Sequence, residues 1–175
     1  MRTGLDRDQG PAFLIVLMPG MIMPTGAIEL LIEPLSRDVI ASVFPLMQAV
    51  NPSLSSANWR QFARQAGAHP VRAQRGILIA RRPTQRFPVG AVCYRRHHDV
   101  GQGAILTAEH YVALDLLYPD RVIEALIAGL EPVALRLGCR TIRSIVHGSE
   151  ETLIETLHGQ GHAAEAVTMT KRVKG

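Results

Sequence analysis

Residues 103–146 read GAILTAEHYVALDLLYPDRVIEALIAGLEPVALRLGCRTIRSIV, and this stretch decides the fold. Its two ends, residues 103–116 and 141–146, are apolar enough to be buried strands. Between them, residues 120–137 carry apolar side chains at helical spacing on one face, and Gly138 follows where the helix should stop. Because a helix that crosses between two strands of one sheet makes them parallel, the stretch predicts a parallel pair with a right-handed connection.

The rest of the chain predicts further elements on both sides of this unit. We expect strands over residues 27–33, 76–80, 89–94 and 164–172, helices over 36–50, 55–66 and 150–157, a polar loop over 81–88, a charged turn over 95–103 and a Gly-rich turn over 159–162. This β-α-α-β-β-β-α-β-α-β order predicts an α/β fold. Its mixed, mostly antiparallel central sheet is flanked by helices on both faces.

The chain reads as one domain over residues 23–175, preceded by an extension. The apolar run at residues 12–18 is too short for a membrane span, and Met18, Met21 and Met23 offer later starting points. We therefore expect residues 1–22 to be a disordered or wrongly assigned extension.

Cys93 and Cys139 are too few for a disulfide framework and favour buried free thiols in the cytoplasm.

Charge is distributed unevenly along the chain, whose net charge is +4. Residues 39–98 contain nine arginines and no acidic residue, whereas ten of the fifteen acidic residues follow His98. A basic half favours an anionic ligand, nucleic acid or an acidic protein surface. A GC-rich genome that favours arginine, together with a solvated sheet face, explains the arginines equally well. We do not expect nucleic acid or a membrane as partner.

With this order of elements, the chain resembles a divergent member of the GCN5-related N-acetyltransferase (GNAT) superfamily. The resemblance spans about residues 27–173 and rests mainly on the order of the elements. Two stretches support it. Residues 125–139 resemble the central helix and its glycine stop, and residues 157–172, with Gly161-His162 and Met169-Thr170-Lys171, resemble the C-terminal tail. The resemblance implies transfer of an acetyl group from acetyl-CoA to a primary amine by direct attack.

The resemblance also implies where the reacting groups lie. A general base should lie on the strand before the central helix, where Glu109 and His110 occur. The thioester should lie where two parallel strands part, here near residues 113–116. The candidate cofactor-binding residues are Leu114, Asp115, Leu116, Arg121 and Val122.

Two features depart from the pattern of that superfamily. The phosphate loop should contain glycines, but Tyr118, Arg121 and Ile123 occupy its marked positions, so the loop is altered or binds by other means. The tyrosine expected to protonate the thiolate is replaced by Leu157, and Tyr111 and Tyr118 are possible substitutes that leave this acid unassigned. These departures motivate the alternative that the chain is a catalytically degenerate binding or regulatory module.

Other signals are weaker. His97-His98-Asp99 lacks a partner with ligand spacing, and His147, His158 and His162 match no zinc motif, so we expect no metal site. The resemblance implies a small-molecule or protein amine as acceptor, selected by residues 36–70 and 81–88. A sheet edge offers a surface for a homodimer.

Overall fold

The computed structural model describes residues 29–67, 74–147, 150–167, 169 and 171. The strands are β1 (Leu31–Pro34), β2 (Arg75–Arg81), β3 (Pro88–Asp99), β4 (Gly103–Ala113) and β5 (Thr141–Ser144). The helices are α1 (Ile40–Val50), α2 (Ser56–Gly67), α3 (Pro119–Arg136) and α4 (Glu151–Gly159), with a 3-10 turn at Arg37–Val39 before α1. The proposed extension over residues 1–22 lies outside the described residues and stays a prediction.

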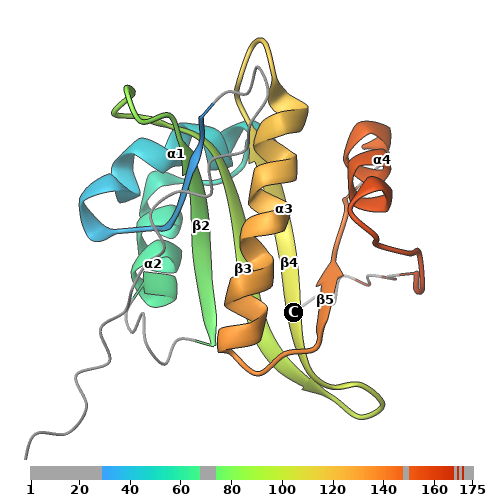
Figure 1. Ribbon diagram of the computed structural model, residues 1–175. Helices are drawn as coiled ribbons and strands as arrows, with labels where there is room; N and C mark the ends of the chain where they lie inside the picture. The colour runs from blue at the N-terminus through green and yellow to red at the C-terminus, as the bar shows by residue number, and fades with distance from the viewer. Residues whose placement is uncertain (1–28, 68–73, 148–149, 168, 170, 172–175) are drawn as a thin grey trace, which may run out of the picture.

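One five-stranded sheet runs in the order β1-β2-β3-β4-β5. The first four strands pair antiparallel with their neighbours. β4 and β5 pair parallel, from Ile105 opposite Thr141 to Ala108 opposite Ser144, with α3 crossing between them (Figure 1). The predicted mixed α/β sheet and its single parallel pair are therefore confirmed.

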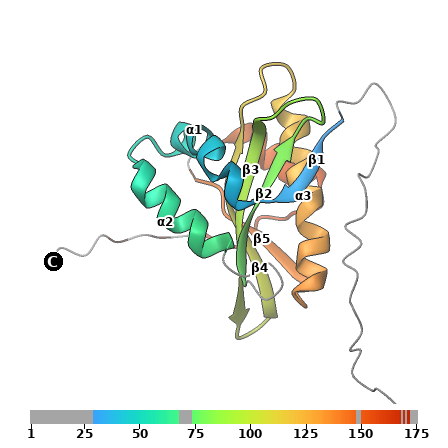
Figure 2. The same cartoon turned by 90° about the vertical axis from the view of Figure 1, so that its left-hand side faces the viewer.

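Helices cover both faces of the sheet, as Figure 2 shows edge-on. α1 and α2 pack on one face around Trp59 and Val43, whereas α3 and α4 pack on the other around Leu126 and Leu130. Each face therefore has its own apolar core, and burial of these two cores is the main force that holds the layers together.

Two local expectations differ from the structure. β3 continues through Arg95–Asp99, where a turn was predicted, because residues 95–99 pair with residues 103–107 of β4 and need no apolar pattern to do so. The predicted strand over residues 164–172 is not found in the residues described there, which are exposed, the apolar Val167 and Met169 included, and pair with no strand in the described part of the chain.

Candidate active site where two parallel strands part

β4 and β5 separate halfway along β4. The last backbone bond between these two segments runs from the Ile145 N–H to the Ala108 carbonyl, at 2.8 Å. β4 then continues to Ala113 beside β3, while the chain after Ser144 leaves the sheet for α4 (Figure 1). The strands thus part at Glu109, several residues before the predicted position at residues 113–116.

A β-bulge at His110 accounts for this early separation. His110 has a φ of +56°, and the pairing with β3 shifts between Cys93, opposite Glu109, and Ala91, opposite Val112. One extra residue of β4 is therefore accommodated there, which bends a strand and increases its twist. The predicted position was wrong because a bulge leaves no mark in the hydrophobic pattern.

The bulge also reverses which side chains face which core. Ala108 faces the α3 core, and regular alternation would turn Val112 the same way. Instead Tyr111 joins the α3 core and Val112 joins the α1–α2 core. The bulge therefore delivers the Tyr111 side chain to the place where the two strands part.

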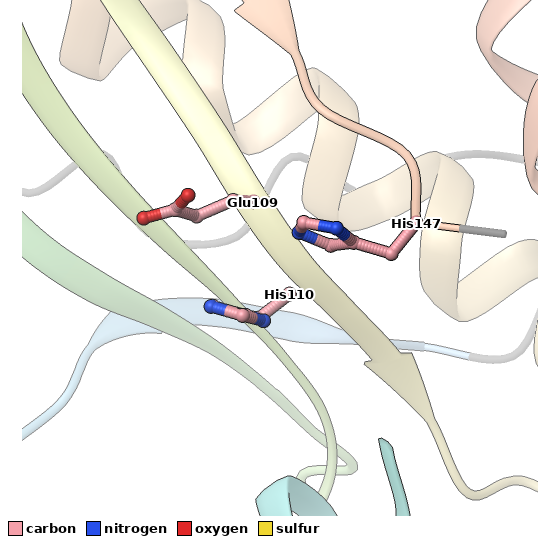
Figure 3. A group of neighbouring side chains, drawn as sticks. All are labelled: Glu109, His110 and His147. Carbon is pink, nitrogen blue, oxygen red and sulfur yellow. The ribbon is translucent and has the colours of Figure 1, made fainter. Parts of the chain in front are cut away.

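Glu109, His110 and His147 lie together beside this separation (Figure 3). Their candidate donor atoms all lie within 4.8 Å of one another, and the two imidazole rings are 5.5 Å apart with planes 20° from parallel. Glu109 and His110 are half-buried and His147 is exposed. The structure thus brings His147 to the two predicted base residues, a pairing that their separation in sequence did not suggest.

A chain of hydrogen bonds crosses the gap between the strands. The Tyr111 hydroxyl lies 2.7 Å from the Ser144 hydroxyl, which lies 3.2 Å from Nε2 of His162 in the turn after α4. Burial raises the pKa of Tyr111 to about 12, while its bond to Ser144 acts in the opposite direction. Burial also lowers the pKa of His162. Tyr111 therefore keeps its proton at neutral pH, and a neutral His162 can accept from Ser144.

A small pocket opens beside these groups. It has a volume of about 150 Å³ and is lined by Val50, Asn51, His110, Tyr111, Ile145, His147, Glu150 and Leu153. Since a cavity of about 10–15 Å³ by this measure holds one water, the pocket has room for a small acyl group. Glu109 is not part of its lining.

The loop between β4 and α3 contains the other predicted site residues. Asp115 accepts hydrogen bonds from the N–H groups of Leu117 and Tyr118, at 3.1 and 3.0 Å, and pairs with Arg82 at 2.5 Å. Leu116 is fully exposed, and Leu114 donates its N–H to the carbonyl of Val89. The Asp115 carboxylate is therefore already bonded to the two backbone N–H groups that lie just before α3.

The start of α3 positions the last two predicted residues. Arg121 is exposed and pairs with Glu124, with its Nη1 at 2.8 Å from a carboxylate oxygen. Val122 is fully buried, and its N–H bonds the Tyr118 carbonyl. The amides of Asp120 and Arg121 precede the first intrahelical bond, so they are the donors that remain for an anion at this helix end.

The sequence matches no known protein-family model and no curated protein. Solved structures do resemble the fold. An aminoglycoside N-acetyltransferase in complex with CoA superposes with a TM-score of 0.72 at 14% identity, covering 88% of this chain and 100% of that one. The chain has the fold of the GNAT acetyltransferases.

Two further GNAT-fold structures have similar values. Glucosamine-6-phosphate N-acetyltransferase from Arabidopsis thaliana has a TM-score of 0.66 at 11% identity, covering 83% of this chain and 99% of that one. Ribosomal-protein-alanine N-acetyltransferase from Brucella melitensis biovar Abortus has a TM-score of 0.67 at 14% identity, covering 82% and 99%. The expected resemblance is thus confirmed for the fold.

No helix in the described part of the chain has the length and apolar character to cross a membrane.

Sequence reasoning did not assign a role to Ser144, His147 or His162. These residues lie on a strand, in a loop and in a turn, so their spacing in the sequence does not indicate that they share a site. The only available clue was that the β5 segment and the turn after α4 must both lie beside β4.

Proposed function

We propose that this chain transfers an acetyl group from acetyl-CoA to a primary amine by direct attack. The observation that carries the proposal is the separation of β4 and β5 at Glu109, where the candidate base His110 and the buried Tyr111 line a small pocket and Glu109 lies next to His110. The likeness to an acetyltransferase in complex with CoA supports the choice of cosubstrate.

In the proposed reaction the amine nitrogen attacks the thioester carbonyl. Glu109 or His110 takes the proton that the amine loses, directly or through one water. The new C–N bond forms as the C–S bond breaks, and the CoA thiolate leaves with the electron pair. Tyr111 gives its proton to this thiolate, which supplies the acid missing at Leu157, and regains a proton from solvent or from the protonated base once the products leave.

The chain's fit to acetyl-CoA differs between the two ends of that molecule. The pocket beside Tyr111 suits the acyl end. At the pyrophosphate end, Asp115 repels a phosphate and covers the amides of Leu117 and Tyr118. Binding there would rely on the Arg121 guanidinium and on the free amides of Asp120 and Arg121. We expect weaker binding of the nucleotide end than a glycine-rich loop would provide.

The acceptor would be a small-molecule or protein amine. Among the structures of similar fold, one carries the name of an aminoglycoside, one of glucosamine-6-phosphate and one of a ribosomal-protein alanine. The fold therefore accommodates both classes of amine and does not choose between them.

Release of the CoA thiol in the presence of a panel of sugar amines, polyamines and peptides with free N-termini tests this proposal. Glu109→Gln removes one base. His110→Asn removes the other and keeps a residue that tolerates positive φ. Loss of the true base should lower the rate by roughly 10²–10⁴-fold, while the other variant keeps most of the activity.

The second candidate function is a degenerate binding module of the same fold, favoured by the Asp115 contacts and by Leu157. Acetyl-CoA binding with no thiol release from any amine in the panel would support it and would contradict acetyl transfer. Amine-dependent thiol release would exclude it.

A further inference from the structure

The group formed by Glu109, His110 and His147 has a donor composition that enzymes use for metal ions. Two imidazoles and one carboxylate bind zinc in catalytic sites and leave a position open for water or substrate. Magnesium and calcium prefer sites made of oxygen donors, so the two histidines select a transition metal of the zinc class. From the sequence we expected no metal, because His147, His158 and His162 match no zinc motif and Glu109 and His110 lie far from them along the chain.

The three donor side chains come from two separate segments of the chain. The bulge holds His110 next to Glu109, in place of the opposite orientations that a regular strand imposes. His147 comes from the segment that leaves β5, just after the strands part. Figure 3 shows the Glu109 carboxylate and the two imidazoles beside one another along β4.

The distances suit a metal after small side-chain rotations. Two ligand atoms on one tetrahedral zinc lie about 3.4 Å apart, given bonds of about 2.1 Å. The donor atoms here already lie within 4.8 Å of one another. Within the described part of the chain, no hydrogen bond or ion pair holds these three side chains in other positions. They can therefore close on an ion without breaking a hydrogen bond or an ion pair, although the stacked His110 and His147 rings would have to turn.

The pocket beside the group would serve the open coordination positions. His110 and His147 both line it, together with Asn51 and Glu150, whose polar groups can hold metal-bound water. We infer that Glu109, His110 and His147 form a binding site for one divalent transition-metal ion of the zinc class. The inference does not depend on acetyl transfer, although a bound ion would occupy the Glu109 and His110 atoms that the proposed transfer uses as bases.

Titration of the tag-free, metal-stripped full chain with ZnCl₂ by calorimetry, and with CoCl₂ by visible absorption, tests the site. We expect one equivalent of Zn²⁺ per chain and the strong visible bands of four- or five-coordinate Co²⁺. His147→Ala and Glu109→Gln should each weaken Zn²⁺ binding at least tenfold. His147 is exposed, so its replacement should leave the fold intact, which circular dichroism checks.

His98→Ala is the matched control, because His98 is an exposed histidine near the tip of the β3–β4 hairpin. This variant should bind Zn²⁺ as the unchanged protein does. The inference is overturned if His147→Ala and the unchanged protein bind Zn²⁺ equally. A Co²⁺ spectrum that stays that of the hydrated ion overturns it as well.

Discussion

Tyr111 is the residue on which the proposed proton transfer depends. Its ring is buried against the α3 core and its hydroxyl lies between the separating strands, bonded to Ser144. Tyr111→Phe keeps the ring and removes only the transferable proton. We predict a fall in kcat of about 10²-fold with little change in the KM for acetyl-CoA, measured by thiol release.

Tyr94→Phe is the control for this change, since Tyr94 is a second buried tyrosine of the sheet that lies outside the pocket. It should keep kcat within about twofold. Equal losses in both variants would mean that Tyr111 acts only through packing.

Asp115 gives a prediction about stability and pH. The hydrogen bond from Arg82 holds the pKa of this carboxyl below its usual range, and the backbone bonds from Tyr118 and Leu117 act in the same direction. The ionised group therefore stabilises the folded state fully above the unfolded pKa of about 3.9, and this contribution disappears as the pH falls through the folded pKa.

Asp115→Asn should thus lower the free energy of unfolding by about 1–3 kcal/mol at pH 7, and by progressively less below about pH 4. Urea unfolding at several pH values between 7 and 3 measures the difference. Glu124→Gln, which removes an exposed pair, should cost under about 1 kcal/mol. A pH-independent difference for Asp115→Asn would show that its charge is not what matters.

Among the elements, α3 packs tightly against β3 at Gly90, which has no side chain. A Cβ added at Gly90 would overlap a methyl group of Val122 and lie 3.0 Å from the Val112 carbonyl oxygen. Neither the fully buried Val122 nor the backbone of β4 can move aside easily. We predict that Gly90→Ala lowers the free energy of unfolding by about 1–3 kcal/mol in urea denaturation.

Gly159→Ala is the matched control, because a Cβ at the end of α4 meets nothing within 4 Å. It should leave stability unchanged or slightly raised. Equal stability of the two variants would mean that α3 can shift away from β3 at no cost.

Most elements were predictable because their signals are local. The apolar stripe of α3 and the glycine that follows it marked the helix, and the apolar strands marked the sheet. The bulge at His110 was not predictable, since it depends on how β4 pairs with β3. The tail after α4 has the apolar residues of a strand, yet a strand needs a neighbour to pair with, and the sequence does not specify one.

At the scale of the whole molecule, the candidate site combines β4, the end of β5, the loop before α4 and the turn after it. Sequence reasoning placed Glu109 and His110 because they lie on one strand before the central helix. Ser144, His147 and His162 join them only after α3 has crossed the sheet and α4 has packed beside it. Contacts of this kind depend on tertiary structure, which no local pattern encodes.

The central claim is that the separation between β4 and β5 receives the acyl end of acetyl-CoA. Ile145 lines the pocket there, so Ile145→Trp would fill it, whereas Gln102→Trp adds the same side chain at the exposed β3–β4 turn. Calorimetry with acetyl-CoA should give saturable binding at one site per chain, weakened at least tenfold by Ile145→Trp and unchanged by Gln102→Trp. An absence of binding at millimolar acetyl-CoA, or equal affinity in all three proteins, would contradict the claim.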